Sequence, residues 1–228
     1  MAAPAFGAAG TYLAGTAANS AVAYPASVGA GDILLMAMYI ESTTAVTPPG
    51  SWVQKATVAV TGVSAHTFRL FWIRATGGES GTVTFTHSSA YRECMMARYT
   101  GCVASGDPFD TAGVNTASST TPSSATPAVT LTTGGADELL VWYTTNFDGG
   151  TFTAPSGFNG RHLANDMAIA DLAQTVAGST GSLAGTGPSA ADGKTAALGA
   201  LLPAATASPA PRGPLVMPGL AAIQAGSW

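Results

Sequence analysis

The three histidines, His66, His87 and His162, are the side chains best suited to acid–base or metal chemistry near neutral pH. None stands in a His-x-His or His-Glu-x-x-His spacing, which would bring two metal ligands onto one face of an element. No Gly-x-Ser-x-Gly segment marks a nucleophilic serine between a strand and a helix. The sequence predicts structural histidines and leaves open only a Ser-His-Asp site assembled from distant parts of the chain.

Acidic side chains could pair as the two carboxylates of a glycosidase. The candidates are Glu41, Glu79, Glu93, Asp107, Asp110, Asp137, Glu138, Asp148, Asp166, Asp171 and Asp192. Many have Gly, Pro or Ser as neighbours, which is typical of turns. Asp107 and Asp110 could bind calcium, but two carboxylates in four residues are too few for a calcium cage. We expect turn-forming residues, with no catalytic residue, metal or cofactor.

Several aromatic side chains could form a platform for a sugar. Trp142, Tyr143 and Phe147 are the candidates for glycan binding, because Phe147 lies in the segment Asn146–Gly150, which has the composition of an exposed loop tip. Trp52 follows a proline turn, where packing in the core or at its rim is the competing interpretation. A host-surface carbohydrate is therefore an open ligand class.

The two cysteines, Cys94 and Cys102, are expected to be buried thiols. An extended chain of eight residues spans about 26 Å. A disulfide requires the two Cα atoms to lie within roughly 7 Å of each other. Two thiols and three scattered histidines do not make a zinc site either.

Composition limits the classes of partner. Only 9% of the 228 residues are charged and the net charge is −4, without a basic run. Nucleic acid is therefore a poor partner. No apolar stretch is long enough to span a membrane, and the N-terminal residues do not read as a signal peptide. We expect no membrane insertion and synthesis in a cytoplasm; the low charge suits a protein packed against others.

The elements that must position these residues form an internal repeat. The first set of expected strands covers 32–40, 66–74, 82–86 and 92–99, and the second covers 139–145, 167–175, 183–186 and 195–202. A turn at Pro49–Trp52 matches one at Pro155–Phe158, and Asp32 matches Asp137. Residues 167–175 are Ala-rich, yet the repeat favours a strand there.

Because no segment has a capped apolar period of 3.6, the sequence predicts an all-β protein. With the strand that follows each matched turn, each half has five strands. Each half alone would leave an apolar face, and stacking the halves would bury both faces. We expect a single jelly-roll-like antiparallel β-sandwich over residues 1–203, built from similar halves at about 31–102 and 136–203. Residues 103–135, rich in Ser, Thr, Gly, Ala and Pro, are expected to be a loop that joins the halves.

Residues 204–228 differ from the rest and are expected to form an extended C-terminal arm. Four prolines within the segment exclude a continuous helix or a central strand. Its apolar side chains are costly to leave in water, which favours docking on a neighbouring molecule over packing back on the chain's own domain. The expected partner-binding residues are Arg212, Leu215, Val216, Met217, Leu220, Ile223 and Trp228.

Several stretches together resemble a domain of tailed-phage virion proteins, often from phages that infect actinobacteria. They are Gly31–Met36, the Pro-Gly-Ser-Trp turn, Phe71–Thr76, Gly81–Thr84, Asp107–Asp110, the second turn and Ala196–Pro203. The resemblance covers about residues 5–203. It implies a jelly-roll or lectin-like sandwich in a structural or minor tail protein, and it supplies no catalytic residues.

The resulting expectation is a non-enzymatic bacteriophage virion protein at the tail tip or another minor tail position. Its expected partners are other virion proteins and copies of itself, and its expected location is the phage particle. Three alternatives stay open: a capsid decoration protein, a module that binds host glycans, and a glycan hydrolase.

Overall fold

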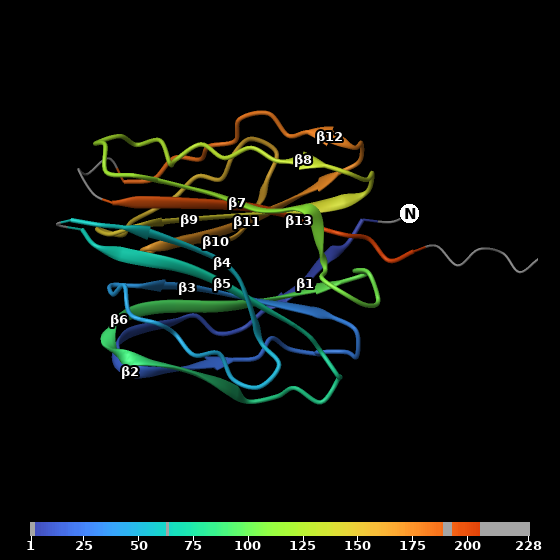
Figure 1. Ribbon diagram of the computed structural model, residues 1–228, viewed down its shortest axis with the longest axis horizontal. Helices are drawn as coiled ribbons and strands as arrows, with labels where there is room; N and C mark the ends of the chain where they lie inside the picture. The colour runs from blue at the N-terminus through green and yellow to red at the C-terminus, as the bar shows by residue number, and fades with distance from the viewer. Residues whose placement is uncertain (1–2, 63, 189–192, 206–228) are drawn as a thin grey trace, which may run out of the picture.

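The computed structural model describes residues 3–62, 64–188 and 193–205, and every regular element in them is a β-strand (Figure 1). Two antiparallel sheets pack face to face, which confirms the predicted all-β sandwich. No helix in the described residues is long and apolar enough to cross a membrane. The start of β1 (Ala5–Ala9) and the end of β13 (Lys194–Leu201) lie at the same end of the sandwich.

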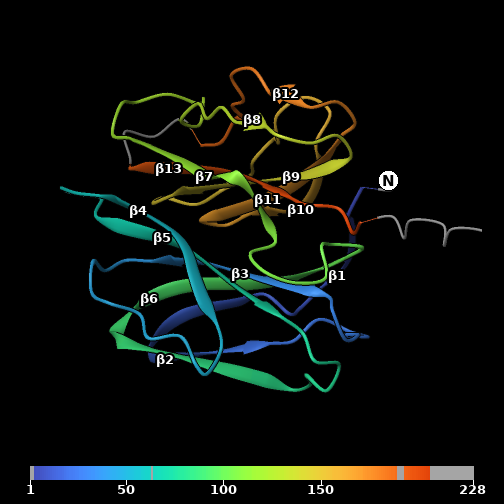
Figure 2. The ribbon, with the colours of Figure 1, turned by 45° about the vertical axis from the view of Figure 1, so that its right-hand side comes forward.

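The first sheet has the strand order β1-β6-β3-β5-β4, and β2 also pairs with β6. Besides β1, its strands are β2 (Leu13–Ala23), β3 (Ile33–Ile40), β4 (Val53–Val60), β5 (His66–Arg74) and β6 (Thr82–Thr100). The long strand β6 pairs with β2 up to Cys94 and with β1 from Ala97 onward, so β1 and β2 follow each other along one edge. Figure 2 shows β2 on the side away from the second sheet.

The second sheet has the strand order β10-β11-β9-β13-β7. Besides β13, its strands are β7 (Phe109–Ser119), β9 (Glu138–Asn146), β10 (Asn159–Ala164) and β11 (Met167–Gln174). A small ribbon of β8 (Thr132–Thr133) and β12 (Gly178–Ser179) lies apart from it. The Ala-rich segment at Met167 is a strand, as the repeat predicted. Ala168 and Ala170 belong to the same outer apolar cluster as Trp142.

The two sheets repeat one strand order, because β4-β5-β3-β6 followed by β1 and β2 corresponds to β10-β11-β9-β13-β7. The matched turns agree in detail: the Trp52 N–H donates to Pro49 O and the Phe158 N–H to Pro155 O, both at 3.1 Å. A bulge follows each turn at the same distance, between Gln54 and Ala56 in β4 and between Gly160 and His162 in β10. The two similar halves predicted from the sequence are therefore confirmed.

The strand order also corrects details of the prediction. The chain completes one sheet before it begins the other, and β3 to β6 stand in the order β6-β3-β5-β4. Residues 103–135 are not simply a joining loop, because they contain β7, the counterpart of β1 and β2. Residues 183–186 form isolated bridges, such as Val129 with Leu183, rather than a strand.

A further correction moves the repeat by one residue. Asp32 stands just before β3, and Glu138 is the first residue of β9. Each of the two carboxylates accepts a hydrogen bond from the backbone N–H three residues earlier, from Gly29 at 2.8 Å and from Gly135 at 2.7 Å. Asp137 is thus the counterpart of Gly31, and both have a left-handed backbone, with φ of 60° and 88°. Asp32 therefore corresponds to Glu138, not to Asp137.

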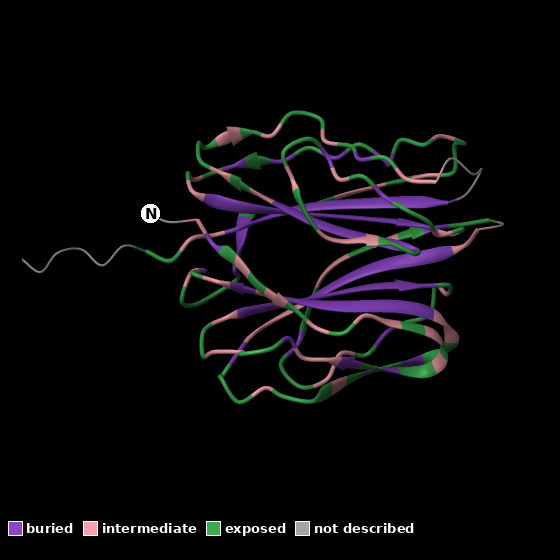
Figure 3. Ribbon diagram, turned by 180° about the vertical axis from the view of Figure 1, so that it is seen from behind, coloured by how far each residue is buried: buried purple, intermediate pink, exposed green. Residues whose placement is uncertain are grey.

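Three apolar clusters explain why the central strands are apolar on both faces. One cluster fills the space between the sheets, and one more lies on the outer face of each sheet. Every residue of β3, β9 and β13 is consequently buried. In Figure 3 the buried strands occupy the middle of the molecule, and the exposed segments lie mainly on its outer sides. The continuous apolar runs in the sequence have this origin.

Candidate functional site

The residues expected in the C-terminal arm lie outside the described part of the chain. This applies to Arg212, Leu215, Val216, Met217, Leu220, Ile223 and Trp228. The described chain ends with residues that are still held in place. Val103 N–H donates to Leu202 O at 2.9 Å, and Ala204 N–H donates to Gly101 O at 2.8 Å. The described chain is therefore held against the sandwich up to Ala204.

The expected glycan platform is not at the surface. Trp142 is fully buried in the outer core of the second sheet, and Tyr143 is buried between the sheets, with its ring 5.4 Å from that of Phe68. Strand β9 is central in its sheet and covered on both faces, so neighbouring side chains enter different cores. Phe147 is half-buried and lies 6.4 Å from the His66 ring. The prediction that Trp142 and Tyr143 bind a sugar is wrong for this reason.

His66 joins the two sheets. Its Nδ1 lies 2.9 Å from Ser64 O and its Nε2 lies 2.9 Å from the Thr145 hydroxyl, which contacts the Thr195 hydroxyl at 2.6 Å. Burial lowers the pKa of His66 to about 4, so the ring is neutral at neutral pH. A carbonyl only accepts, so Nδ1 carries the proton and Nε2 accepts from Thr145. His66 is thus a buried structural histidine.

The other two histidines are also engaged inside the fold. His87 Nε2 lies 2.8 Å from the Ser20 hydroxyl, and His87 Nδ1 lies 2.8 Å from Ser88 O. This is a Ser–His contact, but Ser20 is fully buried and a backbone carbonyl takes the place of an acid. His162 stacks on Tyr12, with ring centroids 4.6 Å apart.

Both cysteines are buried, as expected. Burial raises the pKa of the Cys94 thiol and that of the Cys102 thiol to about 12 each. Neither is therefore a thiolate at neutral pH, the form needed for nucleophilic attack.

One pair of carboxyl groups lies between the sheets at the end of β3 that Ile40 occupies. Glu93 is buried and accepts a hydrogen bond from the Asp166 N–H at 2.9 Å and from the Tyr91 hydroxyl at 3.1 Å. Burial raises the pKa of Asp166 to about 7, and the charge of Glu93 contributes to the rise. Glu93 belongs to β6 and Asp166 to the turn between β10 and β11, so this pair connects the two halves.

A second carboxyl pair, Asp110 with Glu138, lies at the opposite end, beside Ala205, the last described residue. Burial alone would raise the pKa of Asp110, but N–H donation from Ala112 at 2.7 Å and from Gly134 at 2.9 Å holds it below its ordinary value. Burial raises the pKa of Glu138 to about 7, and Asp110 adds to the rise. Within the described residues no donor reaches Glu138 Oε2.

The first half neutralises its corresponding carboxylate. Asp32, the counterpart of Glu138, pairs with Arg98, whose Nη1 lies 3.0 Å from Asp32 Oδ2. The Arg98 guanidinium crosses Gly7 so closely that a Cβ there would lie 2.7 Å from it. The pairing registers place Ala200 where the first half has Arg98. The same place in the fold thus holds a salt bridge in one half and two carboxyls in the other.

A pocket of about 400 Å³ lies beside this second pair. Its walls are largely small or apolar, and Asp110 and Glu138 are the two titratable residues among those lining it. The lining residues are Val103, Asp110, Thr111, Gly134, Gly135, Ala136, Glu138, Leu202, Pro203 and Ala205. An apolar pocket with two convergent carboxyls is suited to a cationic group with an apolar surround.

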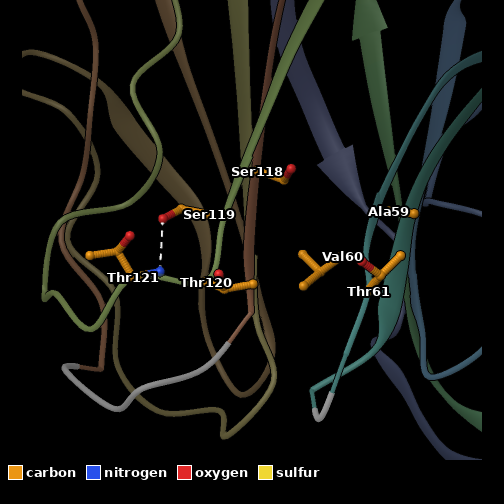
Figure 4. Close-up of a pocket in the computed structure, with 7 residues that line it drawn as sticks. All are labelled: Ala59, Val60, Thr61, Ser118, Ser119, Thr120 and Thr121. Carbon is orange, nitrogen blue, oxygen red and sulfur yellow. Dashed lines mark hydrogen bonds between the residues drawn. The ribbon is translucent and has the colours of Figure 1, made fainter.

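Another pocket, of about 360 Å³, lies between the ends of β4 and β7. Figure 4 shows Val60 and Thr61 on one side and Ser118 to Thr121 on the other. The Thr121 N–H donates to the Ser119 hydroxyl at 3.1 Å. The described side chains that line it are hydroxyl-bearing or aliphatic, so they can offer hydrogen bonds.

The two bulges place basic residues in matching positions. Lys55 lies at the bulge of β4, with its Nζ 5.0 Å from the centre of the Phe109 ring on β7. Arg161 lies at the bulge of β10, with its guanidinium carbon 4.2 Å from the centre of the Phe6 ring on β1. Each bulge therefore carries a cation to an aromatic ring of the other sheet. Sequence reasoning missed this pair, although a basic residue stands three positions after the aromatic residue of each matched turn.

Each of these cations also meets a carboxylate. Lys55 Nζ lies 2.5 Å from Asp107 Oδ2, whose side chain is 51% exposed. Arg161 forms two hydrogen bonds of 2.7 Å with Asp171, whose side chain is 2% exposed. The first contact joins β4 to the segment before β7, and the second joins the neighbouring strands β10 and β11.

Within residues 3–62, 64–188 and 193–205, no group of three or more His, Cys, Asp or Glu side chains is placed to hold a metal ion. Comparison of the chain with protein-family models, with curated proteins and with solved structures found no match.

Proposed function

We propose that this protein is a non-enzymatic structural component of a tailed-bacteriophage particle, at a minor tail position. The observation that carries the proposal is that the side chains best suited to chemistry are engaged in contacts that hold the fold together. His66, the Glu93–Asp166 pair and the two bulge cations all form contacts between the sheets. Such contacts hold the two sheets in fixed positions relative to each other, as a structural component requires. The motifs that resemble phage virion domains support the same role.

The strand edges favour attachment through the C-terminal arm over attachment by strand addition. The edge strands β4 and β10 each carry a bulge, and the pairings of the opposite edge strands β1, β2 and β7 are also interrupted by register shifts. An irregular edge of this kind resists pairing with another chain. The chain, in contrast, is held up to Ala204 and continues for a further 24 residues that include six large apolar side chains. In a particle that holds many copies, weak docking of each arm would be strengthened by avidity.

Removal of residues 206–228 tests this proposal. The truncated chain retains Ala204 and its hydrogen bond to Gly101, so the sandwich is expected to fold. We expect the truncated chain to be lost from purified particles, as measured by quantitative mass spectrometry of their proteins. A Gln224→Ala chain, which alters the arm without removing charge or large apolar groups, is the matched control. Incorporation of the truncated chain at normal copy number would contradict attachment through the arm.

A further inference from the structure

We propose that the pocket at Asp110 and Glu138 receives the C-terminal arm of a second copy of this chain, whose Arg212 pairs with the two carboxyls. This names a partner for the assembly role proposed above and rests on that role.

Within the described part of the chain, Glu138 lacks the cationic partner that Asp32, its counterpart in the first half, has. In the first half Arg98 neutralises Asp32. In the second half Glu138 is fully buried, faces a second carboxyl at Asp110, and has one oxygen that no described donor reaches. A buried carboxylate without a cation is costly, and a buried, hydrogen-bonded cation offsets that cost. The pair is therefore suited to an arginine.

The second half also has room for that arginine. Ala200 replaces the residue that corresponds to Arg98, so no guanidinium from β13 covers the carboxyls. A pocket of about 400 Å³ lies beside them. Its walls at Val103, Leu202 and Pro203 are apolar and match the apolar residues that follow Arg212 along the chain.

The C-terminal arm carries the required group. Residues 206–228 contain a single charged side chain, that of Arg212. The segment starts at the pocket, because Ala205 is part of the pocket wall. Seven residues extend up to about 25 Å, and Pro209 and Pro211 favour an extended backbone over a tight reversal. Arg212 of the same chain would have to reverse direction within this short stretch, whereas Arg212 of a second copy would not.

Sedimentation velocity of the full-length chain over a range of concentrations provides the test. We expect reversible self-association at pH 8, weakened at least tenfold by Arg212→Ala and by Glu138→Gln. Gln224→Ala in the arm and Glu41→Gln, an exposed carboxylate after β3, are the controls and should leave association unchanged. Arg212 belongs to none of the described strands of the two sheets, so Arg212→Ala keeps the test valid if Glu138→Gln fails to fold. A chain that is monomeric at all concentrations would overturn the proposal.

Mixing the two variants shows whether the arm of one copy binds the pocket of another copy or the pocket of its own chain. The Arg212→Ala chain has an intact pocket and the Glu138→Gln chain has an intact arm. A tagged Glu138→Gln chain should therefore retain untagged Arg212→Ala chain, while neither variant should retain its own untagged form. Equal retention in all pairings would contradict the proposal. Normal incorporation into particles of a chain that is monomeric when purified would refute this docking site and leave the virion role standing.

Discussion

The contact between His66 and Thr145 predicts a specific loss of stability in acid. The ordinary pKa of 6.5 falls to about 4 for His66 in the folded protein, because burial disfavours the imidazolium. The unfolded chain therefore binds more protons than the folded chain between these two values. By linkage, the stabilising contribution is complete above about pH 6.5 and is lost as the pH falls toward 4.

The size of this effect follows from the two pKa values. One pKa unit corresponds to about 1.4 kcal/mol, so the free energy of unfolding should fall by about 3 kcal/mol between pH 8 and pH 4 through His66 alone. Other groups titrate in the same range. Glu138 and Asp166, whose pKa values are raised to about 7, act in the opposite direction. The total pH profile of the native chain therefore does not isolate the histidine.

Comparison with a His66→Gln variant isolates it. Urea unfolding of both chains at several pH values between 4 and 8 gives the difference in their free energies of unfolding. We expect the native chain to be the more stable at pH 8, and we expect its advantage to shrink by about 3 kcal/mol by pH 4. All other titrating groups contribute equally and cancel. A difference that stays constant across this range would refute a neutral, buried His66 between the sheets.

Further predictions concern the bulge cations and the thiols. Arg161→Met should lower the free energy of unfolding by about 3 kcal/mol in urea unfolding, because it leaves a buried carboxylate without its partner. Lys55→Met at the matching bulge should cost about 1 kcal/mol or less, since its partner carboxylate is half-exposed; equal costs would contradict this contrast. Cys94 and Cys102 should react with a thiol reagent only after denaturation, because both are buried and protonated; rapid labelling of the folded chain would be inconsistent with that burial.

Much of the fold was predictable because the repeat constrains it. The apolar run after Asp32, its counterpart before Asn146 and the two proline turns identified both sheets. The Ala-rich strand β11 was recognised in the same way, against its local propensity. In each of these places a local pattern and its repeat agree.

The remaining features depend on packing that the sequence does not reveal. Strand β7 has the Ser, Thr and Ala composition of a linker, and only its place beside β13 makes it a strand. Trp142 was predicted to be a surface aromatic, but segments distant in the sequence cover the outer face of β9. Nothing in the sequence around Trp142 indicates that these segments will pack on it. The Asp110–Glu138 pair is formed by residues 28 positions apart that become neighbours only when the second sheet is complete.

The measurement that most directly tests the proposed role is immunogold labelling of purified phage particles with an antibody against the sandwich domain. We predict gold labelling at the tail. Particles from a phage that lacks the gene for this chain are the control and should carry no gold. Labelling over the head would make the protein a capsid decoration protein and would contradict the tail position. Particles that carry no label, although the antibody binds the purified chain, would contradict the virion role itself.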